Sequence, residues 1–287
     1  MQLRISEEAK TARIRYILIL VISLAGWFSL GGMLTLLLKR LSFFSETKAG
    51  IFIVTFVPHL VLLLFLTILV RYTFREKLGT LVGGKGVRDF LTTALITLVV
   101  IGLTETFSRG NIVYNSTDGW GEKALFLVLS AVLLLPQTLT EEVVFRILPE
   151  RILFPEERNL GRIRRILLAS FCGIFFVLPH LLNTEVTSSS TPVIPLVTYF
   201  LWGFLSSLLG TYVHSYVPVW AMHYANNFFS VVIVSAEKTT LTGAPLFYDT
   251  SEEYSPLLIV TTLLVFLVVS LFFRYIGKRE DKESFSG

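Results

Sequence analysis

The sequence predicts an all-α polytopic membrane protein, with about eight transmembrane helices around an intramembrane polar cavity. Hydrophobic residues make up 53% of the chain, charged residues make up only 16%, and the mean hydropathy is +0.69. Several apolar runs reach the roughly 20 residues that a helix needs to cross a hydrocarbon core about 30 Å thick. No alternating pattern typical of a transmembrane β-barrel is visible, so helices, which satisfy their own backbone hydrogen bonds, are the predicted spanning elements.

Eight apolar runs account for most of the chain and leave little sequence for a soluble domain. We therefore predict a single membrane domain over residues 1–287. The first run is longer than the 7–15 apolar residues of a signal-peptide core, so it is expected to remain a spanning helix. The predicted spans are Tyr16–Leu38, Gly50–Val70, Phe90–Phe107, Ala124–Ile147, Ile163–Leu182, Val193–Val213, Tyr216–Ala236 and Pro256–Ile276.

The excess of basic residues follows the membrane topology and does not indicate a nucleic-acid partner. When the N-terminus is placed in the cytoplasm, 19 of the 25 Lys and Arg residues fall in cytoplasmic segments. Lys39, Arg40 and Lys48 oppose this orientation and are outnumbered. The positive-inside rule therefore predicts an integral protein of the cell membrane with both termini in the cytoplasm.

Three ionisable residues at the end of the fourth predicted span are the first candidates for chemistry, because such groups are costly in a membrane. Glu142 and Arg146, at positions i and i+4, share one helix face and are expected to neutralise each other. Glu141 is rotated by about 100° and is left free. A desolvated carboxylate is suited to accept a proton from water. The alternative is an ordinary cytoplasmic helix end, because Pro149 and Arg151 follow closely.

Two later spans add polar groups at helical spacing. Phe176 and His180 lie at i and i+4 in the fifth predicted span, and His223 and Asn227 share a face of the seventh. His223 and Asn227 are able to donate hydrogen bonds to a developing oxyanion, or equally to join neighbouring helices. His59, in the second span, has no obvious helical polar partner and is assigned a structural or interfacial role.

The three motifs together resemble those of one protease family. Glu141–Arg146 resembles the EExxxR motif of the CAAX protease and bacteriocin-processing family, also called abortive-infection membrane proteases. Phe176–His180 resembles the family's FxxxH motif, and His223–Asn227 resembles its HxxxN motif. The motifs come in the family's order within residues 124–236, while the outer spans agree only in hydropathy. Ile147 departs from the pattern, since many members have glycine after the arginine.

This resemblance implies an intramembrane endopeptidase that hydrolyses membrane-associated or prenylated (CAAX-type) substrates with a glutamate-activated water and without a cofactor. The expected partners are a peptide or lipidated-protein substrate and membrane lipids. By analogy, Glu141 activates the water with help from His180, and His223 and Asn227 stabilise the oxyanion. The implied supporting residues are Glu142, Arg146 and Phe176.

Other functions stay open at this point. Glu141, His180 and His223 are potential ligands of a catalytic zinc with an open coordination position. A non-catalytic scaffold or partner-binding protein would keep the same polar cluster for helix packing, whereas a proton-coupled transporter is disfavoured by the lack of paired halves. The site is expected to open toward the cytoplasm. Helical rise places His180 about 22 Å from Arg165, so the fifth helix must start deeper or tilt for His180 to approach Glu141.

Overall fold

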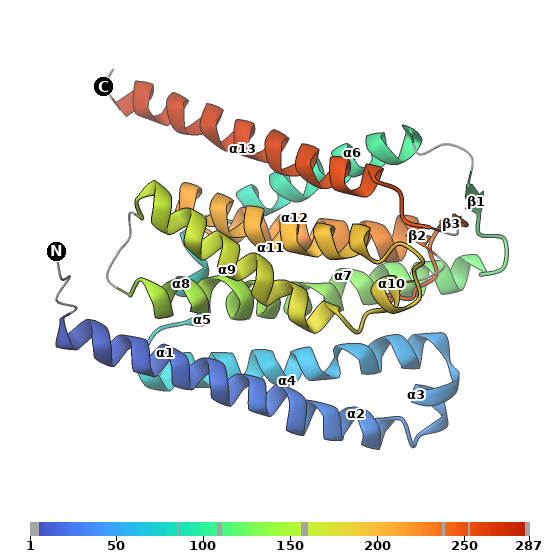
Figure 1. The fold of residues 1–287 in the computed structure, drawn as a ribbon. Coiled ribbons are helices and arrows are strands. Elements are labelled where there is room, and N and C mark those ends of the chain that lie inside the picture. The colour runs from blue at the N-terminus through green and yellow to red at the C-terminus, as the bar shows by residue number, and fades with distance from the viewer. Residues whose placement is uncertain are drawn as a thin grey trace.

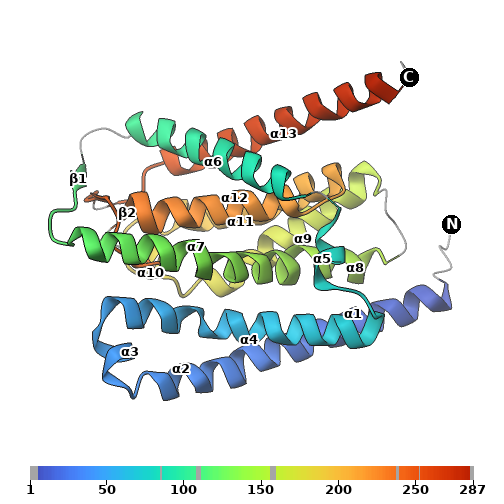
Figure 2. The same cartoon turned by 180° about the vertical axis from the view of Figure 1, so that it is seen from behind.

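The protein is a bundle of long helices that lie side by side and are closed at one end by a small β-sheet (Figures 1 and 2). Both ends of the described chain lie at the opposite end of the bundle (Figure 1). Many apolar side chains on the outer surface are exposed, among them Leu64, Leu95 and Leu267. The predicted all-α polytopic class is confirmed. The computed structural model describes residues 6–84, 86–107, 111–155, 160–236, 239–251 and 253–284, with side chains for all of these except 107 and 277–284.

Seven helical runs among the described residues are long and apolar enough to cross a membrane. They are Glu7–Leu38, Lys48–Phe74, Val87–Thr106, Trp120–Leu153, Arg162–His180, Val193–Val213 and Leu257–Ile276. The helices are α1 (Glu7–Gly26), α2 (Gly32–Leu38), α3 (Ser42–Glu46), α4 (Lys48–Phe74), α5 (Leu78–Val82), α6 (Val87–Phe107), α7 (Trp120–Glu142), α8 (Leu148–Leu153), α9 (Arg162–His180), α10 (Thr184–Thr187), α11 (Val193–Val213), α12 (Val217–Phe228) and α13 (Leu257–Ser284). Three π-helical turns continue helices without a break: η1 (Trp27–Gly31), η2 (Val143–Ile147) and η3 (Phe229–Ile233).

The seventh predicted span, Tyr216–Ala236, is wrong as a single helix. Its first part is α12, which continues through η3 only as far as Ile233. The chain then becomes extended in β2 (Val234–Ala236), because these residues pair with another strand. The other seven predicted spans each correspond to one of the long helical runs.

The helices form three layers that place α7, α9, α11 and α12 in the middle (Figures 1 and 2). The α1, α2 and α4 helices lie on one side of this central layer, and α6 and α13 lie on the other. All three candidate motifs belong to the central layer, so they are shielded on both sides by other helices.

Close packing of α9 on α11 depends on a glycine. A Cβ atom added at Gly203 would lie 2.7 Å from the Cys172 carbonyl oxygen and 2.9 Å from the Phe176 Cβ atom. Small residues of this kind let spanning helices approach closely. Because Phe176 and His180 lie on α9, this contact also positions one wall of the candidate site.

We expect Gly203→Ala to lower the free energy of unfolding by about 1–3 kcal/mol, the usual cost of overpacking a close contact. The obstacle is largely backbone, which cannot rotate away. The measurement is thermal unfolding of the purified protein in detergent. Gly32→Ala, at a helical position with nothing within 4 Å of the added Cβ, is the matched control and should be neutral or stabilising. Equal melting of the two variants would contradict the role given to Gly203.

A three-stranded sheet closes the end of the bundle away from the termini. β1 (Ile112–Tyr114) pairs antiparallel with β3 (Phe247–Asp249), and β2 pairs parallel with β3 on its other side. Asp118 stabilises this end of the bundle by accepting hydrogen bonds from Lys48 and Asn115. Burial alone would raise the pKa of the Asp118 carboxyl, but these hydrogen bonds hold the pKa below its usual value. Loops that are far apart in the sequence are thereby joined.

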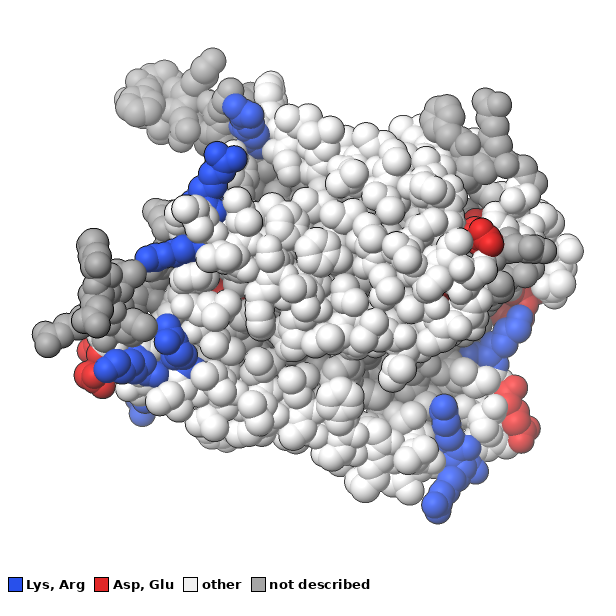
Figure 3. Space-filling view, viewed as in Figure 1, with Lys and Arg blue, Asp and Glu red and all other residues white. Residues whose placement is uncertain are grey.

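Basic side chains gather at the end of the bundle that carries the ends of the described chain (Figure 3). A smaller basic group lies over α2 and α3 at the sheet end (Figure 3). Lys39, Arg40 and Lys48, the residues that opposed the predicted orientation, lie between the end of α2 and the start of α4.

Candidate active site

Glu142 and Arg146 form a fully buried ion pair within the fourth span. Arg146 Nη1 lies 3.1 Å from Glu142 Oε1, and both side chains are completely inaccessible to solvent. The guanidinium carbon also lies 4.0 Å from the centre of the Phe176 ring on α9. The expected i, i+4 pairing is therefore present, and it ties α7 and η2 to the neighbouring helix that carries His180.

Glu141 faces a cavity instead of this ion pair. It lies on α7 with Gln137 one helical turn before it, and the Gln137 side-chain amide donates to Glu141 Oε1. Its second oxygen, Oε2, is buried and accepts no hydrogen bond from any described residue. The sequence predicted a free carboxylate, whereas the structure holds one oxygen and leaves the other open.

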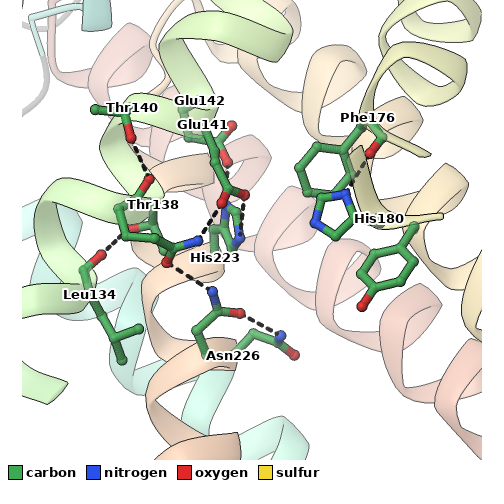
Figure 4. Close-up of polar contacts among 12 residues, drawn as sticks. Leu134, Thr138, Thr140, Glu141, Glu142, Phe176, His180, His223 and Asn226 are labelled. Atoms are coloured by element: carbon green, nitrogen blue, oxygen red, sulfur yellow. Dashed lines mark hydrogen bonds and ion pairs between the residues drawn. The ribbon is translucent and has the colours of Figure 1, made fainter. Parts of the chain in front are cut away.

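His223 connects the two glutamates. Its Nδ1 lies 2.7 Å from Glu142 Oε1, and its Nε2 lies 3.6 Å from Glu141 Oε2 (Figure 4). A neutral imidazole that donates from Nδ1 has its lone pair on Nε2. A proton between His223 and Glu141 can then be held by either group, which is what acid–base chemistry at this position requires.

Asn227 joins the same network through Gln137. Asn227 Nδ2 donates to Gln137 Oε1 over 3.2 Å, while the other end of the Gln137 amide donates to Glu141. One glutamine thus fixes both a candidate base and a candidate oxyanion donor. Since an amide nitrogen carries two hydrogens, Asn227 keeps one N–H beyond the bond to Gln137.

His180, the last residue of α9, lies across from this network (Figure 4). Its Nδ1 donates to the Phe176 carbonyl oxygen over 2.6 Å, and its ring lies 4.2 Å from that of Tyr199. This bond leaves the lone pair of the neutral ring on Nε2. No hydrogen bond or ion pair joins His180 to Glu141 or His223 in the described part of the chain, and the three residues share a cavity instead.

The fourth span is longer than predicted, which reduces the expected difference in depth between Glu141 and His180. That run continues beyond the predicted end at Ile147 to Leu153, so Glu141 lies 12 residues, about 18 Å, from the end of the helix. His180 lies 18 residues, about 27 Å, from the start of α9 at Arg162. By this measure His180 lies about 9 Å nearer the sheet end than Glu141, at the end of α9.

A cavity of about 390 Å³ contains the candidate residues. Glu141, His180, His223 and Asn227 all line it, and its wall continues to residues of α10 and β3 at the sheet end. Its volume lies within the usual range of ligand-binding sites. The structure therefore has a cavity where the sequence predicted one, lined by the four candidate catalytic residues.

Gln137 and His59 also line this cavity, but the sequence did not predict that they belong to the site. Gln137 lies four residues before Glu141, and this spacing was the available signal. His59 was assigned a structural or interfacial role, yet it lines the cavity from α4, and its buried Nδ1 has no hydrogen-bond partner among the described residues. Its ring lies 5.5 Å from that of Trp27. No spacing pattern in the sequence links His59 to the motifs.

The zinc alternative has no ligand set in the described part of the chain. No three His, Cys, Asp or Glu side chains are grouped there as metal ligands. Glu141, His180 and His223 share a cavity, but they do not converge on one point as a tetrahedral site would need.

A comparison against known protein families gives a match over the segment that contains the motifs. Residues 122–229 match the family model described as type II CAAX prenyl endopeptidase Rce1-like. This match supports the CAAX protease family for the part of the chain that carries the three motifs. The region that matches this CAAX protease family contains all seven candidate site residues, whereas α1 to α6 and α13 lie outside it. Comparisons with curated proteins and with solved structures give no match.

Proposed function

We propose that this membrane-embedded CAAX-type endopeptidase uses Glu141 as the general base that activates a water molecule. The observation that carries the proposal is Glu141 Oε2, which has no hydrogen-bond partner among the described residues and is buried in a cavity also lined by three histidines. A carboxylate with one oxygen held by Gln137 and the other open is oriented toward whatever occupies the cavity. The matching family model is described as a CAAX prenyl endopeptidase. A membrane-associated or prenylated peptide is therefore the proposed substrate.

In the proposed reaction, the water oxygen attacks the scissile carbonyl carbon while one water proton passes to Glu141. The carbonyl electron pair moves onto oxygen, and that oxyanion is stabilised by the remaining N–H of Asn227 and by His223 Nε2 when it holds the proton that it shares with Glu141. His180 orients the water through its Nε2. The oxyanion then collapses, the C–N bond breaks, and the proton on Glu141 passes to the leaving amine. Glu142, Arg146 and Phe176 take no proton and hold His223 and α9 in position.

The proposal is tested with a mixed library of peptides and membrane-protein segments incubated with purified protein in lipid nanodiscs. The wild type should generate new peptide termini, which mass spectrometry identifies, and Glu141→Gln should generate none of them. Products that appear equally with both proteins would come from another source or another base. A complete lack of products with intact wild type would favour the non-catalytic scaffold.

We also propose that both termini lie in the cytoplasm, on the basis of the positive-inside rule and the basic end of the bundle (Figure 3). The cavity extends toward the sheet end, which lies opposite the termini (Figure 1). The predicted opening toward the cytoplasm and the predicted cytoplasmic termini therefore favour opposite ends of the bundle. With cytoplasmic termini, the cavity faces the outer side.

The orientation can be measured by cysteine labelling, because the single Cys172 is buried and gives little background. In intact cells, a membrane-impermeant maleimide should label Ser188→Cys, an exposed position beside α10 at the sheet end. Lys10→Cys, an exposed position on α1 near the other end, should be labelled only after the membrane is permeabilised. The reverse pattern would place the termini outside.

A further inference from the structure

The wall of the cavity is acidic at the sheet end. Among the described residues that line the cavity, five are Asp or Glu and none is Lys or Arg. Three of these carboxylates lie in α10, in β3 and in the loop after β3, and we call them the acidic rim: Glu185, Asp249 and Glu253. The rim is partly exposed to solvent, whereas Glu141 in the same cavity is only 7% exposed.

No described basic residue compensates the charge of the acidic rim. The ion pairs among the described residues involve none of the three carboxylates. The rim carboxylates accept hydrogen bonds from neutral groups: Thr239 and Thr240 to Glu185, Ser251 to Asp249, and Ser190 to Glu253.

The interior of the cavity independently indicates a ligand. Two buried atoms of residues that line the cavity, Glu141 Oε2 and His59 Nδ1, have no hydrogen-bond partner among the described residues; His223 Nε2 lies 3.6 Å from Glu141 Oε2, beyond hydrogen-bond length. Buried polar atoms are normally satisfied, so an open carboxylate oxygen in a cavity marks a place where a bound group supplies the missing contact. The acidic rim therefore lies on a cavity that is built to receive a ligand.

We propose that the acidic rim selects a peptide segment that carries Lys or Arg and leads it from the sheet end to Glu141. This inference rests on the proposed function, since it names the substrate class of the same site. A cleft lined by charge of one sign, with low-dielectric walls, concentrates ligands of the opposite sign. Acidic segments are repelled by the same field, so the rim provides selectivity as well as attraction.

The test uses two fluorescent peptides that differ only in Lys against Gln at several positions, and binding is measured by fluorescence anisotropy. Binding is measured on Glu141→Gln, which does not consume the peptide. The Lys peptide should bind more tightly than the Gln peptide, and Glu253→Gln should reduce this preference by roughly 1.5- to 5-fold, the range of a partly exposed ion pair. The preference should also shrink in about 1 M salt, where charges are screened beyond about 3 Å.

Glu46→Gln is the matched control, because Glu46 lies on α3 near the sheet end, is exposed and does not line the cavity. It should leave the preference unchanged. Equal binding of both peptides, no binding of either, or equal effects of Glu253→Gln and Glu46→Gln would overturn the inference. Cleavage by the wild type is scored separately. Selective binding without cleavage would support the role of the acidic rim and contradict the peptidase activity. Cleavage without charge preference would support the peptidase activity and contradict the role of the acidic rim.

Discussion

Replacement of Glu141 by glutamine should lower the rate of peptide hydrolysis by about 10²–10⁴-fold, the usual contribution of a general base. Glutamine has almost the same shape and retains an oxygen that accepts the hydrogen bond from Gln137. It cannot accept a proton from water at neutral pH. The loss should therefore appear in kcat with little change in KM, because only an interaction of the transition state is removed.

The rate measurement needs a control that makes the same change in the same helix. Glu122→Gln meets this need, since Glu122 lies in the first turn of α7, is partly exposed and pairs with Lys48 at 3.6 Å, away from the cavity. Its rate should stay within a factor of two or so of the wild type, as expected for a surface ion pair. Both variants should elute and melt like the wild type. Normal turnover by Glu141→Gln would remove Glu141 from the role of base.

Replacement of Arg146 by methionine should lower the free energy of unfolding by about 3–5 kcal/mol. Both members of the Glu142–Arg146 pair are completely buried, so the substitution leaves a buried carboxylate without its cation. The remaining partner, His223, would compensate only by taking a proton. Methionine keeps most of the packing against Phe176, so the loss reports charge rather than volume. Thermal or denaturant unfolding in detergent measures the change.

The double variant Glu142→Gln/Arg146→Met separates charge from packing. It removes both charges and keeps an acceptor for His223 Nδ1, so it should recover much of the stability that Arg146→Met loses. A double variant that is no more stable than Arg146→Met would show that Arg146 stabilises the protein mainly through packing.

Local spacing was sufficient for several features of the candidate site. The Glu142–Arg146 pair follows from helical geometry at i and i+4, and Glu141 faces elsewhere because it is one residue before Glu142. The polar groups of three spans were expected to converge because unsatisfied polar groups are costly in lipid. In the structure, His223 does contact both glutamates.

Features that depend on long-range packing were not predictable from one sequence. His59 enters the cavity because α4 packs against α7, and no local pattern encodes that contact. The end of the seventh predicted span was misplaced because β2 pairs with β3, which lies beyond it in the chain. Hydropathy shows that a segment is apolar, but strand pairing decides where this helix ends. The direction of the cavity likewise follows from the assembled loops at the sheet end.

The two ends of the described chain lie at the same end of the bundle, opposite the end toward which the cavity extends (Figures 1 and 2). An affinity handle or surface anchor fused to either terminus therefore stays clear of the route to Glu141. Protein immobilised through its C-terminus would present that route to the surrounding solution, so added compounds could reach it without crossing the support.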